Sequence, residues 1–526
     1  MNSLAPNVPL AVSAPPAAAQ PQPFGLRIIV GMLGVLLASL SAGLNEKVTD
    51  IAMTDVRGAL SIGHDEGTWL IALYEAFQVA AMAFAPWFSV TLSLRRFTLG
   101  AVACFGLLAL LTPFAPNVHA LYLLRALQGL AGGCLPPMLM TVALRFLPPG
   151  IKLYGLGAYA LTATFAPNLG VPLAAMWTEF VGWQWVFWQV IPLCLIALAA
   201  VAWGIPQDPT RLERFRQFDY LGVLLGLPGL LMLVTGLLQG ERLDWFESPL
   251  ISLLVIGGSG LLAAFFVNEW KHPLPFFRLD LLKRPNLTHA LITLAGVLVL
   301  VSASMSIPAA YLANLHGYRP LQSAPMALMV ALPQLIALPL AAALCNIPRV
   351  DCRWVMAVGI ALCGLSALGM SQLTSDWTRE NFYLLLSLQI LGQPLAMVPI
   401  LMSATSVIAP IEGPFASSWF NGVRAFASVV ATCVVGVLMT HREHYHSNHL
   451  VDQLGNASQA LQLRLGQLGD GSEALGQLAG QVRQQASVLA AADTLWLIAW
   501  LAAALLVLIP LIPHRVYPPR PVVAPH

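Results

Sequence analysis

Charge is scarce in this sequence of 526 residues, since only 10% of them are Asp, Glu, Lys or Arg. Water-soluble domains carry roughly 25%. With 58% hydrophobic residues the chain has more apolar side chains than a soluble core can bury, so its composition excludes a soluble globular protein and indicates a polytopic membrane protein. The net charge of +2 and the absence of a basic run argue against nucleic-acid binding.

Other absences narrow the function further. The sequence contains no Walker sequence, no dinucleotide-binding glycine fingerprint and no serine elbow, which disfavours an ATP-driven pump. Its 7 cysteines avoid the long polar stretch near the C-terminus, so no disulfide framework is expected. Residues 1–24 are rich in Pro and Ala and lack the basic start of a signal peptide. We expect them to form a disordered cytoplasmic tail.

Apolar segments long enough to cross a bilayer, about 20 residues each, recur along the chain. Fourteen can be marked, at residues 27–52, 68–92, 97–115, 119–144, 153–177, 183–205, 219–239, 250–269, 287–312, 323–345, 354–373, 381–409, 415–440 and 490–512. Lys and Arg concentrate in alternate connections, such as 95–96, 211–216 and 271–284. Cytoplasmic loops carry such an excess, so we expect both termini to be cytoplasmic.

Residues 441–489 form the one long external connection in this scheme. Leucines recur there at roughly helical spacing on both sides of a turn-like GDGS sequence. We expect two short amphipathic helices outside the membrane. Two interpretations stay open, because the segment can be a solvated hairpin that covers the external face or a docking surface for a periplasmic partner.

Several motifs resemble those of a known transporter family. The stretch "RALQGLAGGCLPP" (125–137) resembles the fourth-helix signature of major facilitator transporters, and "TATFAPNLGVPLAAMW" (162–177) resembles their antiporter motif. The stretch "SSWFNGVRAFASVV" (417–430) is similar to the fourteen-span drug:proton antiporters of the EmrB/QacA type. The segment "THREHYHSNHL" (440–450) resembles the EmrB branch of that family.

This resemblance implies an all-α major facilitator fold with 14 transmembrane helices, in two six-helix bundles with two inserted helices. The parts would be a first bundle at 25–205, linkers and inserted helices at 206–284, a second bundle at 285–512 and a cytoplasmic tail at 513–526. It also implies a proton-driven exporter of amphipathic or aromatic drugs in the bacterial inner membrane, without a cofactor. Such exporters work with a periplasmic adaptor of EmrA type and an outer-membrane channel, which favours docking on residues 441–489.

Two segments depart from the family pattern. Asn45 and Asp50 exchange the acid and the amide of the first-helix motif, and Glu46 and Lys47 are added between them. The connection at residues 85–100 keeps two arginines but has neither the glycine nor the acid of the latch that this loop forms in relatives.

Ionisable residues inside apolar segments are the candidate proton-coupling groups, because an unpaired charge in the membrane costs several kcal/mol. Glu46 and Asp50 are four residues apart and therefore share a helix face. With Glu75 and Arg125 they should form a coupling layer in the external half of the membrane. Three alternatives stay open: a wetted helix end with a local ion pair, a neutral acid in a helix interface, and a snorkelling arginine.

Polar residues in other apolar segments are candidates for the substrate cavity: Asn45, Gln78, Gln128, Gln334, Gln389, Gln393 and Arg424. Pro167, Gly170 and Pro172 form the candidate gating motif, because proline removes backbone hydrogen bonds and glycine permits close helix approach. Four histidines between residues 441 and 449 lack the cysteines or acids of a zinc site, so we expect protonatable surface groups and no metal.

Two other functions stay open at this stage. The chain can be a narrow exporter of one metabolite or siderophore, because sequence does not separate broad from narrow specificity. It can also be a non-transporting membrane sensor or scaffold, which the incomplete latch at residues 85–100 favours.

Overall fold

The computed structural model describes residues 24–409, 412–456, 459, 461–463, 465, 472–512 and 515–518, and the expected N-terminal tail lies almost wholly outside them. All regular elements of this described part are helices. The N-half comprises α1 Leu26–Ile51, α2 Met53–Leu60, α3 His64–Leu92, α4 Leu94–Leu111, α5 Val118–Gly133, α6 Leu135–Phe146, α7 Lys152–Met176, α8 Trp185–Trp188 and α9 Val190–Gly204. The inserted pair consists of two spans. The first is α10 Tyr220–Gln239, and the second contains α11 Pro249–Ser252 and α12 Gly258–Lys271. The C-half comprises α13 Pro285–His316, α14 Pro320–Cys345, α15 Cys352–Met370, α16 Arg379–Ser406, α17 Gly413–Asn456 and α19 Ser472–Leu508.

Thirteen helices within the described residues are long and apolar enough to cross a membrane, which confirms a polytopic membrane protein. The expected span at 153–177 corresponds to α7, a 25-residue helix that is not among the thirteen. Its Thr, Asn, Gly and Pro residues dilute its apolar character. The count of fourteen therefore stays a prediction. The expected span at 119–144 bends at Cys134, where α5 ends and α6 begins with two prolines near its start.

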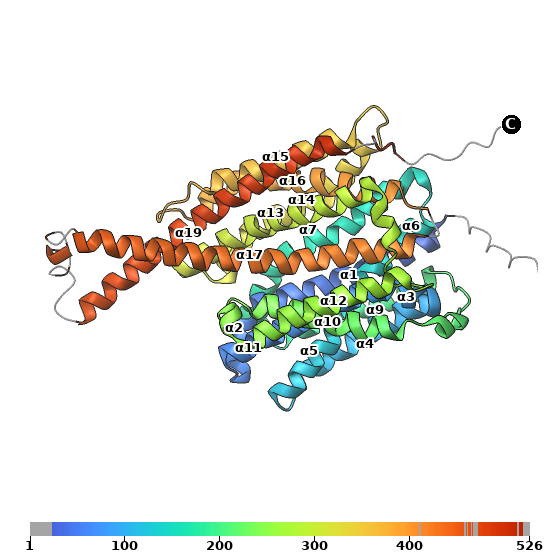
Figure 1. The fold of residues 1–526 in the computed structure, drawn as a ribbon, viewed down its shortest axis with the longest axis horizontal. Coiled ribbons are helices and arrows are strands. Elements are labelled where there is room, and N and C mark those ends of the chain that lie inside the picture. Colours follow the sequence, from blue (N-terminus) through green and yellow to red (C-terminus); the bar gives the residue numbers. More distant parts are fainter. Residues whose placement is uncertain are drawn as a thin grey trace, which may run out of the picture.

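Of the two short helices expected in the external connection, the second is wrong, because its residues belong to the long helix α19, whereas the first, before the GDGS turn, lies mostly outside the described residues. Helix α17 continues from its apolar part without a break to Asn456, and α19 begins at Ser472 and continues to Leu508. The two helices project together beyond the bundle as a helical arm (Figure 1). No Pro or Gly interrupts residues 437–454, so nothing in that sequence ends the helix where the apolar run stops. The GDGS turn falls mostly on residues that the structure does not describe.

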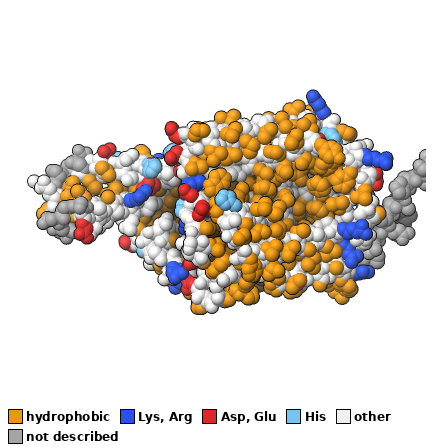
Figure 2. Space-filling model, turned by 90° about the horizontal axis from the view of Figure 1, so that it is seen from below, with side chains coloured by type: hydrophobic (Ala, Val, Ile, Leu, Met, Phe, Trp, Pro, Cys, Tyr) orange, Lys and Arg blue, Asp and Glu red, His pale blue; other side chains and the backbone are white. Residues whose placement is uncertain are grey.

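The halves meet along helices that are far apart in sequence. Helix α7 of the N-half packs on α14 of the C-half, and α3 packs on α17. The inserted pair lies against α3 and α17, so it touches both halves (Figure 1). A single apolar core joins the N-half, the inserted pair and the C-half. The face of the bundle that Figure 2 shows is broadly apolar, as expected of a protein in a bilayer.

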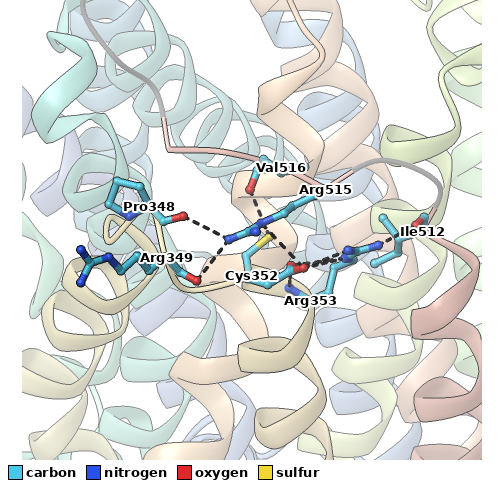
Figure 3. Close-up of polar contacts among 8 residues, drawn as sticks. Pro348, Arg349, Cys352, Arg353, Ile512, Arg515 and Val516 are labelled. Carbon is cyan, nitrogen blue, oxygen red and sulfur yellow. Dashed lines mark hydrogen bonds and ion pairs between the residues drawn. The ribbon is translucent and has the colours of Figure 1, made fainter.

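The two described ends of the chain lie at the same end of the bundle (Figure 1). The C-terminal end is held there by contacts with the connection between α14 and α15 (Figure 3). Arg515 donates to the carbonyl oxygens of Pro348 and Arg349 at 3.1 and 3.2 Å, and lies 3.8 Å from Asp351. Burial opposes ionisation of Asp351, but hydrogen bonds from Arg353 outweigh it and hold the pKa of Asp351 below its ordinary value.

Candidate functional site

A small central cavity of about 100 Å³ lies between the halves. Helices α1, α3, α6 and α7 contribute to it from the N-half, and α13 and α17 from the C-half. Its lining residues are Ser39, Gly43, Glu46, Lys47, Glu75, Gln78, Val79, Met82, Pro136, Thr162, Ala163, Pro167, Leu298, Arg424, Ala425, Ser428 and Val429. Two acids and two bases therefore face one cavity within helices that cross the membrane.

The N-half supplies three of these four charges. Lys47 Nζ lies 3.0 Å from Glu46 Oε1, and Gln78 of α3 donates to Glu46 Oε2 at 2.8 Å. The Gln78 contact ties α3 to α1. Glu75, one helical turn before Gln78, lines the same cavity and has no ion-pair partner among the described residues. The cavity thus holds one acid that is paired and one that is not.

Helix α7 fixes Lys47 from the opposite side. A Cβ atom on Gly170 would lie only 2.8 Å from Lys47 Cβ, so only glycine lets the two helices approach this closely. Pro167 lines the cavity, and both Pro167 and Pro172 lie inside the continuous helix α7. The predicted gating residues therefore lie beside the charged cluster, while their gating role stays a prediction.

Arg125 lies next to the cavity in a separate buried cluster of side chains, which we call the Arg125 nest. It is 2% exposed and donates to Asn45 Oδ1 at 2.9 Å and to Gln128 Oε1 at 2.7 Å. Its guanidinium stacks on the Tyr74 ring at 4.1 Å from the ring centroid. A Cβ on Gly129 would lie 2.2 Å from the Tyr74 carbonyl oxygen, so this glycine brings α5 against α3.

The predicted coupling layer is only partly assembled in this structure. Glu46 and Glu75 face the cavity, whereas Arg125 contacts amides and a tyrosine ring and, within the described residues, no acid at ion-pair distance. Asp50 is exposed and lies outside the cavity lining, one turn beyond Glu46. Asp50 is the last residue but one of α1, which ends at Ile51.

Arg424 on α17 is the cation that the C-half contributes to the cavity. It donates to Thr162 Oγ1 at 3.1 Å and lies 5.5 Å from the Tyr159 ring centroid, both on α7. Its Nε is buried without a hydrogen-bond partner. Nearby, the Tyr159 hydroxyl donates to Asn421 Oδ1 at 2.7 Å, which is a second polar bond between the halves.

The predicted cavity residues divide into three groups. Gln78 and Arg424 line the cavity, and Asn45 and Gln128 belong to the Arg125 nest. Gln334, Gln389 and Gln393 instead lie together inside the C-half, fully buried and outside the cavity lining. Gln393 donates to Gln389 Oε1 and Gln334 to the Ile390 carbonyl oxygen, each at 3.4 Å. Only the Gln334 bond joins two helices, α14 and α16, because Gln389 and Gln393 are both on α16.

Sequence reasoning missed the neutral groups that orient the charges, above all Tyr74, Tyr159, Thr162 and Asn421. Their partners are distant in sequence, with 262 residues between Tyr159 and Asn421. Aromatic and hydroxyl residues in apolar segments carry no sequence signal that separates such roles from packing.

The histidines of the arm contact protein groups: His446 Nε2 lies 2.7 Å from Asp493 Oδ2. Among the described residues no group of three His, Cys, Asp or Glu side chains could hold a metal ion.

Comparison with known proteins places this architecture. The model of the Major Facilitator Superfamily matches residues 35–432, and the chain belongs to that family. It is 22% identical over 497 residues to the multidrug export protein EmrB of Escherichia coli, covering 92% of this chain and 95% of EmrB. It is 25% identical over 423 residues to the fatty acid resistance protein FarB of Neisseria gonorrhoeae, covering 80% and 83%. A bacterial homologue of the human lysosomal transporter Spinster, solved in an inward-facing state, matches with a TM-score of 0.55 at 13% identity over 93% of this chain and 98% of that one.

Family membership confirms the major facilitator fold expected from the motifs. It also identifies the chain as a multi-pass membrane transporter and not an enzyme. Its relatives include proteins named for multidrug export. The charged cavity lies where the two halves meet, and an alternating change of their contact would expose it to each side in turn.

Proposed function

We propose that the chain is a proton-coupled exporter of amphipathic molecules in the bacterial inner membrane, with both termini cytoplasmic. One observation carries this proposal: the paired Glu46 and the unpaired Glu75 share a cavity within the membrane-spanning helices. A carboxyl group is costly in such a place and is retained where it does work. Carboxyl groups can also load and release a proton, which arginine cannot readily do.

In the proposed cycle, protons from the periplasm load Glu46 and Glu75 while the cavity faces outward. Loss of negative charge at Glu46 frees Lys47 and Gln78 from their present contacts with this acid. Substrate leaves, the halves exchange faces, and protons depart to the cytoplasm. Antiport requires that proton and substrate have different affinities for the two faces, and a shared cavity lets one displace the other.

The cavity favours molecules that combine apolar surface with a polar or charged group. Met82, Leu298 and Val429 contribute apolar walls, and Glu75 and Arg424 each present a charge without an ion-pair partner among the described residues. Arg424 can pair with an acidic substrate group and Glu75 with a basic one. FarB, named for fatty acid resistance, and EmrB, named for multidrug export, are relatives whose names fit this class.

We also propose that the arm formed by α17 and α19 docks a periplasmic adaptor of EmrA type, which in turn reaches an outer-membrane channel. The arm extends well beyond the bundle (Figure 1). Its base is braced by Asp493 of α19, which accepts hydrogen bonds from Arg442 and contacts His446 of α17. A braced helical pair offers a defined surface to a partner, whereas a free loop would pay an ordering cost on binding.

The test is substrate-driven proton movement in liposomes that contain the purified full-length chain. A panel of lipophilic cations and aromatic acids is added under an imposed pH gradient, with wild type and Glu75→Gln compared. We expect at least one compound to dissipate the gradient with wild type and at least ten-fold less with the variant. Asp50→Asn is the matched control, since it makes the same chemical change outside the cavity.

Two results would overturn the proposal. If compounds bind in a thermal-shift assay but none moves protons, the chain is a sensor or scaffold rather than an antiporter. If substrate moves but Glu75→Gln leaves the proton flux unchanged, the cavity acids do not couple transport.

A further inference from the structure

A second cavity, larger and chemically unlike the first, lies where the inserted pair meets the two halves. Its volume is about 450 Å³. Its walls come from α3 of the N-half, α10 and α12 of the inserted pair, and α13, α17 and α19 of the C-half. We call it the aromatic chamber, after the five aromatic residues in its lining: Phe265, Phe266, Phe277, Trp419 and Phe426.

The aromatic chamber offers no side-chain group that could select a polar ligand. Every lining side chain is apolar or aromatic, and the indole N–H of Trp419 is already used, since it donates to the Arg278 carbonyl oxygen at 3.1 Å. A charged or hydrogen-bonding molecule would lose its hydrogen bonds to water there without gaining others, at a cost of roughly 2–7 kcal/mol for each polar group. The chemistry of the lining therefore selects uncharged groups.

The rings have the geometry of an aromatic binding site. Phe266 and Trp419 are stacked, with centroids 6.1 Å apart and planes 8° from parallel, and Phe277 meets Trp419 edge-on at 4.9 Å. Flat ring faces and edges together accept a further aromatic ring in an offset or edge-to-face arrangement. A volume of this size lies in the range of drug-sized ligand pockets, about 300–1,000 Å³.

The position of the chamber connects the lipid with the central cavity. Lining residues Leu262, Phe266 and Val430 are partly exposed, so the chamber is open at its outer side. Its inner wall is the contact between α3 and α17, where Val79 lines both cavities. Phe426 faces the chamber while its neighbour Ala425 faces the central cavity. Separation of α3 from α17 would therefore join the two spaces.

We propose that the aromatic chamber is a second ligand-binding site, which takes the uncharged aromatic part of a transported amphiphile from the surrounding lipid. The transport part of this statement rests on the proposed function, whereas binding to the chamber does not. In the present conformation the chamber has the room that the central cavity, at about 100 Å³, lacks. The inserted pair thus gains a role, because it closes a binding site that the two halves alone would leave open.

The binding test uses benzophenone, a neutral aromatic molecule that inserts into nearby C–H bonds under ultraviolet light. The full-length chain in lipid nanodiscs is labelled over a range of benzophenone concentrations, and the adducts are mapped by mass spectrometry. We expect saturable labelling of α12 and of α17 near Trp419. Gly422→Leu should reduce it at least five-fold by filling the chamber. A Cβ at Gly422 meets Phe277 at an ordinary 3.6 Å, so the fold should accept the change.

Gly100→Leu is the matched control. Gly100 lines an apolar groove between α4 and α5, and a Cβ there meets nothing within 4 Å. It should leave chamber labelling unchanged, and Ala295→Phe, which fills the chamber from α13, should repeat the effect of Gly422→Leu. Labelling that does not saturate, spreads evenly over the lipid-facing helices or survives both filling variants would overturn the binding site and leave lipid acyl chains as the occupant.

A transport assay tests the second part of the proposal, that the chamber takes its ligand for transport. With an aromatic substrate found in the proton-flux assay, Gly422→Leu should raise KM about five-fold and leave kcat unchanged, and Gly100→Leu should do neither. An unchanged KM in a variant that blocks labelling would overturn the link to transport. If no compound is transported while benzophenone labelling saturates, the proposed function fails and the binding site stands.

Discussion

The interiors of the two halves differ in their polar chemistry. The N-half buries or half-buries Glu46, Lys47, Glu75 and Arg125 on α1, α3 and α5, whereas the buried polar side chains described on α13 to α16 are amides and hydroxyls. The amide group of Gln334, Gln389 and Gln393 keeps one charge state at every pH. The N-half therefore holds groups that can change charge, whereas these buried groups of the C-half keep theirs.

Arg424 is an exception to this contrast between the halves, because it is a charged residue of the C-half that faces the cavity. It belongs to the C-half, yet its hydrogen bond is to Thr162 of the N-half. Placed on α17, it faces the N-half acids across the central cavity without making an ion pair within the described residues. A charge on one half that faces charges on the other will respond to any change of protonation there, because Coulomb forces act across the cavity in a low dielectric.

The largest expected effect tests how much the N-half depends on its charge network. Arg125→Ala leaves Asn45 Oδ1 and Gln128 Oε1 buried without a donor, at about 1–3 kcal/mol each. Gln389→Leu leaves only one buried donor, Gln393 Nε2, without its acceptor, and that bond is long at 3.4 Å, so the cost should be at most about 1–3 kcal/mol. Thermal unfolding in detergent should therefore show a larger shift for Arg125→Ala. Equal shifts would mean that the amides of the C-half carry as much stability as the charge network, and the comparison would fail.

A smaller effect is expected where the halves touch. Tyr159→Phe removes the 2.7 Å bond to Asn421 and should weaken the contact between the halves by about 1 kcal/mol, which is roughly a five-fold change in a two-state equilibrium. The measurement is maleimide labelling of a single cysteine at Ala163 in the cavity, in a chain without its native cysteines. We expect about five-fold faster labelling from the side that this bond closes.

Arg319→Gln is the control for that measurement. Arg319 of the C-half lies 3.5 Å from Glu179 and 3.7 Å from Asp55 of the N-half, but its side chain is 62% exposed. Exposed ion pairs contribute about 0–1 kcal/mol, so labelling should change by less than the Tyr159→Phe effect. A larger change in Arg319→Gln would show that surface charges, and not buried neutral bonds, hold the halves together.

The sequence predicted the elements better than the contacts. Hydrophobic length located nearly every membrane-spanning helix, because the bilayer sets that length. Ionisable residues in membrane-spanning segments are functional candidates by default. This rule directed attention to Glu46, Glu75 and Arg424, which share the cavity. Helical phase could not show that Asp50 lies outside the cavity lining, since this depends on how other helices pack around α1.

Other features depended on tertiary contacts that leave no local trace. Arg125 donates a hydrogen bond to Asn45, which is 80 residues away in the sequence, and not to an acid. The close packing of α5 on α3 at Gly129 is likewise a tertiary contact. The three buried glutamines looked like cavity residues, since an amide in an apolar segment reads the same whether it faces a cavity or a neighbouring helix. The segment after the GDGS turn was predicted as a short helix outside the membrane, although helix formation does not require apolar character and α19 is continuous from there to Leu508.

The smallest expected effect concerns an ion pair beside the C-half, between Arg284, which precedes α13, and Glu412, which precedes α17. Arg284 donates to both carboxylate oxygens of Glu412 at 2.7 and 2.8 Å, and these hydrogen bonds hold the pKa of Glu412 below its ordinary value. A carboxyl whose folded-state pKa lies below its unfolded value of about 4.3 stabilises the fold above that pH. The contribution is lost as the pH falls through the folded-state pKa.

Glu412→Gln should therefore lower the melting temperature of the chain at pH 6–8 by an amount that corresponds to about 1 kcal/mol or less. The difference from wild type should shrink below about pH 4.3, where wild type loses the same ion pair. Asp280→Asn is the control, because Asp280 and its partner Lys283 are both about 70% exposed. A difference that grows as the pH falls would mean that Glu412 is not a stabilising carboxylate.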